Sequence, residues 1–339
     1  MGEARLEVRA KPHRAPSGTM GRMGAVKRVT RRVVKHLALS GLSRLPDSYR
    51  RRLFYALARE LGVTMIEIQG RNGVFTGYVG DLIFTHYILD NTWSAEICAI
   101  ARGAFEGKPA GTFLDIGANI GLTLVPVAQN PAITCLAFEP EPRNFALLRR
   151  NVEHNDPKAH VELFNTALFD KSGTIEFELS PDNLGDHRVR NRTPAPGAVF
   201  REHERDVISV SSKRLDELLD FSKIAAPVVV KLDTQGAEQQ IYDGGRALFA
   251  IAEVLMIEFW PYGIERMGGD AERLIQAIEG DYRYGCFLEP GRVPVRDDLY
   301  EITEIAARMR QLADRKQITF QDINTHDVLL TKQRSILAE

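Results

Sequence analysis

From residue 112 onward, short apolar runs alternate with stretches in which apolar residues recur at helical spacing. The apolar runs have the length of buried strands, and the stretches between them have the period of amphipathic helices. Strands are predicted at 112–116, 133–138, 160–164, 174–179, 207–210, 228–232, 254–259, 282–288 and 328–331. Helices are predicted at 120–129, 142–154, 213–219, from 236 onward and at 271–278. Alternation at this spacing predicts an α/β fold, with a mostly parallel sheet and helices on both faces.

The part of the chain before residue 112 has a different pattern. Residues 1–24 are rich in Gly, Pro, Ser and Arg without apolar periodicity, which predicts a disordered basic tail. Residues 25–39 and 46–61 have apolar positions at helical spacing among many Arg and Lys, so two basic helices are expected. A connecting region at 62–80 and a helix at 82–106 follow.

Charge is distributed unevenly, although the formal net charge is only −1. Residues 1–60 carry 15 Lys and Arg against 4 Asp and Glu, and the other 279 residues carry 29 against 41. A basic amphipathic helix can lie on an anionic membrane or approach another polyanion. The alternative is that residues 25–60 pack on the main domain with their charges in water, and the sequence leaves both interpretations open.

The composition is that of an ordinary globular protein, with 44% hydrophobic and 26% charged residues. The sequence has neither a transmembrane segment of about 18 apolar residues nor the apolar core of a secretory signal. Its three cysteines, Cys98, Cys135 and Cys286, are widely spaced among apolar residues. We therefore expect reduced, buried thiols in a cytoplasmic protein, and neither disulfides nor a zinc site.

Residues 112–121, Thr-Phe-Leu-Asp-Ile-Gly-Ala-Asn-Ile-Gly, join the first of these strands to the following helix. Gly117 and Gly121 lack the Cβ atoms that would block a ligand from this turn. Asp115, at the strand end, can fix the turn or bind the ammonium group of an amino-acid-like ligand. The glycine spacing excludes the dinucleotide fingerprint, and no Gly-Lys-Ser/Thr follows to form a phosphate loop.

The second strand of this unit ends at Glu139, which lies 24 residues after Asp115. A carboxylate at this place can accept hydrogen bonds from both hydroxyls of a ribose, as an acid does in the related dinucleotide fold. A lone Glu after a strand is usually only a solvated residue. Together with the glycine loop, Glu139 predicts a nucleoside-binding site.

Four motifs together resemble the FkbM family of methyltransferases. They are Asp-Ile-Gly-Ala-Asn-Ile-Gly (115–121), Phe-Glu-Pro (138–140), Asn-Thr-Ala-Leu-Phe-Asp-Lys-Ser-Gly (165–173) and Lys-Leu-Asp-Thr-Gln-Gly-Ala-Glu (231–238). They occur in the family's order and cover roughly residues 85–260. The basic N-terminal extension lies outside the resemblance. The family commonly has an acid where Gln235 stands, so a mechanism that needs a carboxylate there is in doubt.

The resemblance implies a class I methyltransferase fold with a seven-stranded, Rossmann-like sheet. It also implies S-adenosylmethionine as the methyl donor and, usually, a hydroxyl acceptor on a sugar, glycan or polyketide. By the same analogy, Asn165–Leu168 lie beside the adenine. The predicted cofactor-binding residues are Asp115, Gly117, Asn119, Gly121, Glu139, Asn165, Ala167 and Leu168. The predicted domains are the tail 1–24, a basic helical extension and connector 25–80, and a methyltransferase domain 81–335.

The acceptor hydroxyl needs a base that activates it. We expect this base at the carboxyl end of a strand, where three candidates lie. Asp233 follows the apolar strand 228–232, Glu238 begins the next helix, and His187 lies in the polar loop 180–188. We expect His187 or Asp233 to accept the hydroxyl proton and Glu238 to orient the substrate. Each also has an ordinary explanation: Asp233 as a loop cap, Glu238 at a positive helix N-terminus, and His187 as a surface histidine.

Asp233 and Glu238 could together hold Mg²⁺, but the sequence offers no third ligand, so no metal site is predicted. Glu258, at the end of strand 254–259, is expected to border the acceptor pocket. Loop 181–206 contains several Pro and Arg residues and is expected to cover an acidic or phosphorylated acceptor.

Two other functions remain open. A nucleic-acid methyltransferase would explain the basic extension, but Asp-Thr-Gln-Gly replaces the Asn-Pro-Pro-Tyr type of loop that surrounds a flipped base. A scaffold that binds S-adenosylmethionine without catalysis would share the fold, although the intact loop and Glu139 argue against it. The sequence predicts neither the identity of the acceptor nor the oligomeric state.

Overall fold

The computed structural model describes residues 6–7, 46–181, 183–190, 204–315 and 324–337. The chain divides into two compact units, Met1–Trp93 and Ser94–Glu339. The basic helix predicted at 25–39 and nearly all of the tail predicted at 1–24 lie outside the described residues. The boundary between the two units falls inside the segment 82–106, which the sequence predicts as one helix.

The first unit contains a small antiparallel sheet and two helices. Strands β2 (Met65–Gly70) and β3 (Gly73–Tyr78) form a hairpin, and β1 (Leu6–Glu7) pairs with β2. Helix α2 (Asp47–Glu60) confirms the helix predicted at 46–61, and α3 (Leu82–Asp90) starts at Asp81, whose carboxylate accepts two backbone N–H groups. The predicted connecting region is therefore a β-hairpin, and the predicted tail contributes a short strand.

The second unit is built on an eight-stranded sheet with the order β14-β13-β15-β12-β11-β4-β5-β6. Its parallel strands are β4 (Gly111–Ile116), β5 (Ile133–Phe138), β6 (His160–Phe164), β11 (Val228–Leu232) and β12 (Val254–Phe259). Beyond β12 follow β15 (His326–Thr331), β13 (Tyr284–Phe287) and β14 (Tyr300–Glu301), each antiparallel to its neighbours in the sheet. The fold is the predicted class I methyltransferase type, with one strand more than seven because the two-residue β14 extends the edge.

Strand β4 is the point at which the chain reverses its direction across the sheet. From β4 the chain continues outward through β5 to β6, and it later returns to the other side of β4 with β11 and then β12. Right-handed crossovers in opposite directions place their helices on opposite faces. Ligands of such sheets bind outside the carboxyl ends of the strands at this reversal point. The site is therefore expected beside the ends of β4, β5 and β11.

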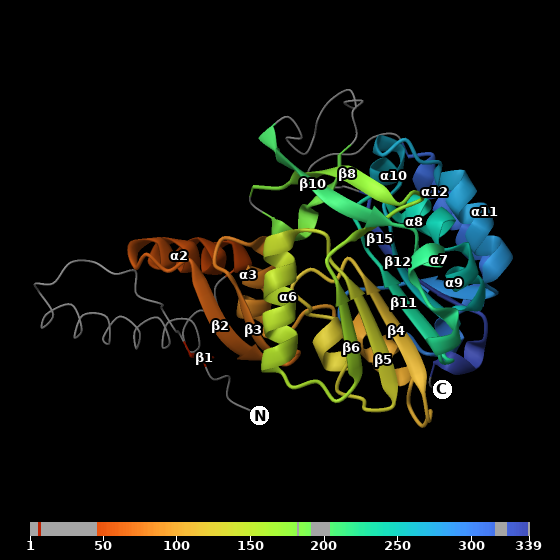
Figure 1. Cartoon of the computed structure of the whole chain (residues 1–339), viewed down its shortest axis with the longest axis horizontal. Helices are drawn as coiled ribbons and strands as arrows, with labels where there is room; N and C mark the ends of the chain where they lie inside the picture. The colour runs from red at the N-terminus through yellow and green to blue at the C-terminus, as the bar shows by residue number, and fades with distance from the viewer. Residues whose placement is uncertain (1–5, 8–45, 182, 191–203, 316–323, 338–339) are drawn as a thin grey trace, which may run out of the picture. The chain divides into compact units, whose positions relative to one another are not determined.

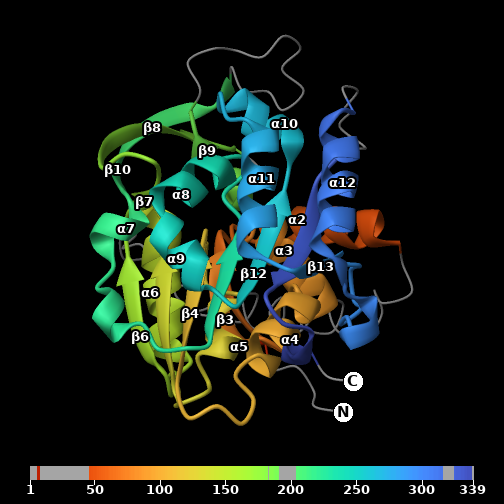
Figure 2. The ribbon, with the colours of Figure 1, turned by 90° about the vertical axis from the view of Figure 1, so that its right-hand side faces the viewer.

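Helices pack against both faces of the main sheet. The helices of the second unit are α4 (Ala95–Gly103), α5 (Leu124–Val127), α6 (Pro142–His154), α7 (Leu215–Leu218), α8 (Glu238–Gly244), α9 (Arg246–Ile251), α10 (Pro261–Arg266), α11 (Ala271–Asp281) and α12 (Ile302–Ala313). Figure 2 shows α8, α9 and α11 on one face. Val228, Val230 and Leu232 of β11 point to this face and share one apolar core with these helices. Burial of such alternate side chains stabilises the layer by roughly 25 cal/mol per Å² of apolar surface.

A second sheet, with the order β7-β10-β8-β9, lies across one end of the main sheet (Figure 1). Its strands are β7 (Ala167–Leu168), β8 (Gly173–Leu179), β9 (Arg188–Val189) and β10 (Asp206–Lys213). The strands predicted at 174–179 and 207–210 therefore pair with each other and are not part of the main sheet. Because β7 follows the end of β6 closely, this sheet stands at the carboxyl edge, where the ligand site is expected.

Strands β4, β5 and β6 and helix α6 agree closely with the prediction, whereas the helix predicted at 120–129 is reduced to the four residues of α5, and the segment 82–106 also differs. It forms α3 and α4, separated by Asn91 and Ser94, whose φ angles of 62° and 41° lie in the left-handed region. The three cysteines are buried and free, as expected. No helix in the described part of the chain is long and apolar enough to cross a membrane.

Candidate functional site

The loop after β4 is held against the loop after β11. Gly117 has a φ of 80°, and a Cβ atom there would lie 1.8 Å from the carbonyl oxygen of Asp233. The backbone N–H of Asp233 donates to the carbonyl of Ile116 at 3.1 Å. Gly121, with a φ of 91°, packs on α6, since its Cβ would lie 2.8 Å from Leu148. Protein packing therefore requires glycine at both positions, in addition to the predicted requirement that a ligand can approach the loop.

Replacing Gly117 by Ala is expected to destabilise the protein by roughly 2–5 kcal/mol, because the new methyl group meets backbone and the φ angle is unfavourable for Ala. Urea unfolding followed by circular dichroism measures this. Gly280→Ala in α11 is the control, since a Cβ there meets nothing within 4 Å. Equal stability of the two variants would contradict the packing described for the loop.

Glu139 connects the ends of β4 and β5. Its carboxylate accepts the backbone N–H of Asn119 at 2.9 Å and that of Glu141 at 2.9 Å, and the residue is 5% exposed. Burial raises the pKa of Glu139 to about 8, although both hydrogen bonds favour the charged form. Each oxygen keeps lone-pair capacity after one N–H bond. The carboxylate is therefore fixed in place with capacity left for ligand hydroxyls.

The loop after β6 joins this arrangement through Asn165. Its side-chain amide donates to the carbonyl oxygens of Glu139 at 2.8 Å and Pro140 at 3.1 Å. Ala167 and Leu168 form β7 and are buried against β10. The structure thus brings Asn165 beside Glu139 and places Ala167 and Leu168 in the edge strand of the second sheet.

Asp115 lies beneath the glycine loop, completely buried. Neither of its carboxylate oxygens accepts a hydrogen bond from the described residues, although Oδ1 lies 3.5 Å from the Lys231 Nζ atom. Burial raises the pKa of Asp115 above its usual range. The side-chain oxygen of Asn119 is likewise buried without a donor among the described residues. These acceptors, together with Glu139, suit a ligand that carries an ammonium group and ribose hydroxyls.

Lys231 is not among the residues that the sequence predicts for the site. It is paired in register with Asp115 across β11 and β4. Its ammonium donates to the carbonyl of Gly117 at 2.9 Å and lies 3.3 Å from Asp233 Oδ2. The available signal was a charged residue inside the apolar run 228–232, because a buried Lys needs an acidic partner.

Glu238 is fully buried at the start of α8. One carboxylate oxygen accepts from the backbone N–H and the hydroxyl of Thr234, at 2.8 and 2.9 Å, and the other accepts from the N–H of Gly236 at 2.9 Å. Burial raises the pKa of Glu238 to about 7. These bonds shape the loop 233–237, so the geometry favours a loop-positioning role for Glu238 over direct contact with a substrate.

Asp233 is the more accessible acid of this loop, with 38% of its side chain exposed. The amide nitrogen of Gln235 donates to Asp233 Oδ1 and to Glu258 Oε2, both at 2.9 Å. Burial, together with the charges of Asp233, Glu238 and Asp327, raises the pKa of Glu258 well above its usual range. Gln235 thus joins two acids at the ends of β11 and β12, where an acid in its place would add a third carboxyl group.

His187 immediately precedes β9 of the second sheet. It is 7% exposed, and its Nδ1 atom accepts the backbone N–H of Ser180 at 2.9 Å. Burial lowers the pKa of His187 to about 4, so the ring is neutral near pH 7. A neutral ring that accepts at Nδ1 carries its proton on Nε2 and donates from there. This arrangement favours Asp233 over His187 as the proton acceptor.

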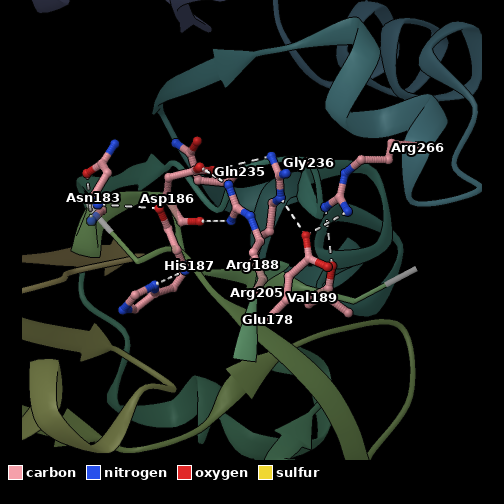
Figure 3. Close-up of polar contacts among 12 residues, drawn as sticks. Glu178, Asn183, Asp186, His187, Arg188, Val189, Arg205, Gln235, Gly236 and Arg266 are labelled. Carbon is pink, nitrogen blue, oxygen red and sulfur yellow. Dashed lines mark hydrogen bonds and ion pairs between the residues drawn. The ribbon is translucent and has the colours of Figure 1, made fainter. Parts of the chain in front are cut away.

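Beside His187, charged side chains form a buried network (Figure 3). The guanidinium groups of Arg188 and Arg266 both bind Glu178, at 2.8 and 3.0 Å, and Arg205 pairs with Asp186. Arg188 also lies 5.5 Å from the centre of the Trp260 ring. Loop 181–206 was expected to place arginines over an acceptor. Residues 182 and 191–203 lie outside the described residues, and the described Arg188 and Arg205 are buried in ion pairs.

The described residues contain no group of three or more His, Cys, Asp or Glu side chains arranged to hold a metal ion. Asp233 and Glu238, the pair considered for Mg²⁺, have different hydrogen-bond and ion-pair partners. Glu238 uses both oxygens on the loop backbone and Thr234, whereas Asp233 faces Lys231 and Gln235.

Several curated proteins are similar to parts of this chain. The 2-O-methyltransferase NoeI of Sinorhizobium fredii is 28% identical over 160 residues, which cover 45% of this chain and 64% of NoeI. The 31-O-demethyl-FK506 methyltransferase FkbM of Streptomyces tacrolimicus is 26% identical over 168 residues, covering 43% and 64%. The hexuronic acid methyltransferase AglP of Haloferax volcanii is 30% identical over 140 residues, covering 41% and 52%. The matches thus span 52–64% of these relatives' own lengths.

The family comparison covers the whole site described above. The Methyltransferase FkbM domain matches residues 115–284, from the buried acid at the end of β4 to the start of β13. This range is half of the chain and includes Glu139, Asn165, Lys231 and Asp233. The protein therefore belongs to the FkbM family of S-adenosylmethionine-dependent methyltransferases.

Proposed function

We propose that this methyltransferase transfers the methyl group to a hydroxyl of a sugar, glycan or polyketide-type acceptor, with Asp233 as the proton acceptor. The observation that carries the proposal is the geometry of Asp233: a part-exposed carboxylate at the carboxyl end of β11, beside the loop that follows β4. The names of the 2-O-methyltransferase NoeI and the 31-O-demethyl-FK506 methyltransferase FkbM, which specify transfer to oxygen, support this acceptor class. That of AglP adds an acidic sugar.

The residues of the donor site fit S-adenosylmethionine by their hydrogen-bonding character. We propose that Glu139 accepts the ribose hydroxyls, that Asp115 and Asn119 face donor groups of the ligand, and that Asn165 and the backbone of 167–168 border the adenine. Gly117 and Gly121 keep the loop in its left-handed conformations. When bound, the cofactor supplies a methyl group activated by a positively charged sulfur.

The acceptor residues then have one task, which is to hold and deprotonate a hydroxyl. An alcohol is a weak nucleophile near neutral pH and gains from a base within hydrogen-bond reach. Lys231 and Gln235 fix the Asp233 carboxylate from two sides. Alignment of the hydroxyl with the methyl group contributes much of the rate in such displacements. Asp233 both orients the hydroxyl, by accepting its hydrogen bond, and takes its proton.

Incubation of the purified chain with methyl-labelled donor tests the proposed acceptor class. Separate reactions contain neutral sugars, a uronic acid, a macrolide alcohol, total RNA and a primary amine. We expect label in a hydroxyl-bearing acceptor, recovered as a methyl ether by mass spectrometry and NMR. Label confined to RNA or to nitrogen would overturn the proposal. Binding of the donor without transfer to any hydroxyl in fractionated cell extract would favour a non-catalytic scaffold.

A further inference from the structure

The side chain of Lys231 lies between the two halves of the site. Its Nζ atom donates to the Gly117 carbonyl in the loop after β4 at 2.9 Å. It also lies 3.5 Å from Asp115 Oδ1 and 3.3 Å from Asp233 Oδ2. Lys231 is 7% exposed, so water screens these contacts weakly. One cation therefore contacts the loop 117–121 after β4 (the donor loop), the buried acid Asp115 beneath it and the proposed proton acceptor Asp233.

The charge of Lys231 is secured by its acidic partners. Burial opposes a charged ammonium, but Asp233 and Asp115 more than offset this and raise the pKa of Lys231 above its usual value. Asp115 has no hydrogen-bond donor among the described residues, so this ammonium is the cation that compensates it. Removing one partner of a buried ion pair leaves an uncompensated charge. A change in position or charge at Asp233 or at the donor loop therefore alters the contacts of the same ammonium.

A second set of contacts makes the connection rigid. The Asp233 N–H donates to the Ile116 carbonyl, and the Asp233 carbonyl occupies the space that a Gly117 side chain would fill. The backbones of the two loops therefore cannot shift independently. The Lys231 ammonium contacts the same two loops, at the backbone carbonyl of Gly117 and the carboxylate of Asp233.

We propose that Lys231 is a positioning residue that couples the donor loop to the proton acceptor Asp233. By holding the Gly117 carbonyl and Asp115 it shapes the donor site, and by facing Asp233 it orients that carboxylate. The proposal rests on the proposed function only in the role given to Asp233. By thermodynamic linkage, a change in the charge of Asp233 alters donor affinity through Lys231, and the reverse also holds.

Lys231→Met removes the charge and keeps much of the volume, whereas Lys231→Arg keeps the charge. Lys171→Met, at an exposed position, is the matched control. We expect Lys231→Met to weaken binding of S-adenosylhomocysteine at least tenfold in calorimetry. Loss of a nearby cation favours the protonated form of a carboxylate, so the acidic limb of the kcat/KM profile is expected to move to higher pH. Lys231→Arg should restore that limb in part, which a purely structural role would not require.

A double-mutant cycle tests the coupling without turnover. If Lys231 couples the loops, the effects of Lys231→Met and Asp233→Asn on S-adenosylhomocysteine affinity will be non-additive by at least threefold. Additive effects, or unchanged affinity in Lys231→Met, would overturn the inference. If Lys231→Met does not fold, the charge-neutral pair Lys231→Met with Asp115→Asn replaces it, and unchanged affinity there has the same meaning. An acceptor other than a hydroxyl would overturn the proposed function but leave these binding results standing.

Discussion

Asp233→Asn is expected to lower kcat by roughly 10²- to 10⁴-fold, the contribution of a positioned general base. Asn keeps the size of the side chain and an oxygen that accepts from Gln235, but it cannot take a proton from the acceptor hydroxyl. Steady-state kinetics with a hydroxyl acceptor measures the effect. Binding of S-adenosylhomocysteine, followed by calorimetry, should persist, with only the moderate change that the loss of a charge beside Lys231 brings.

Asp297→Asn is the control for this variant, because Asp297 is exposed in the segment before β14. It should retain turnover within twofold of the parent protein. Turnover by Asp233→Asn within threefold of the parent, with donor binding intact, would remove Asp233 from the mechanism. His187 would then return as the candidate base, although its Nδ1 atom is engaged with Ser180.

Above pH 8, where Glu139 is ionised, Glu139→Gln is expected to weaken donor binding by about 100-fold, or about 3 kcal/mol, because hydrogen bonds to a charged group contribute roughly 1.5–3 kcal/mol each. The amide nitrogen of Gln would also face one of the backbone N–H groups, of Asn119 or Glu141, that the carboxylate now accepts. Calorimetry with S-adenosylhomocysteine measures the loss. Glu304→Gln, at an exposed position on α12, should bind normally.

The pH dependence of donor binding is a second test of the role of Glu139. Burial raises the pKa of Glu139 to about 8 in the free protein, and ribose hydroxyls donate best to the ionised form. Affinity should therefore fall as the pH drops below about 8, by up to tenfold per unit, and level off above it. Glu139→Gln should lose this dependence. A flat profile in the parent protein would mean that Glu139 does not bind the ribose as an anion.

Much of the main sheet is predictable from the sequence because local signals agree. β5 and β11 are apolar runs of strand length, and α6 begins with Glu141 and Pro142, which are typical of a helix N-terminus. The hairpin β2–β3 also had its signal, since apolar and polar residues alternate at 66–69 and Asn72-Gly73 is a turn sequence. The break between α3 and α4 had only the weak signal of Asn91, which tolerates a left-handed conformation.

Candidate site residues can be predicted where they belong to one short sequence motif, as do the glycine loop and Glu139. The role of Lys231 depends on the register that places it opposite Asp115, residues 116 positions apart in the chain. Such a register is set by tertiary packing and leaves no local trace. The same holds for Glu238, whose three donors come from the turn that it closes, and for His187, whose tautomer follows from one backbone contact with Ser180.

A crystal structure of the chain with S-adenosylhomocysteine tests the central claim most directly. The account predicts that the ribose hydroxyls lie within hydrogen-bond distance of the Glu139 carboxylate, and that the sulfur faces the side of the loop on which Asp233 is exposed. A nucleoside bound elsewhere, or in this crevice with its ribose turned away from Glu139, would contradict it.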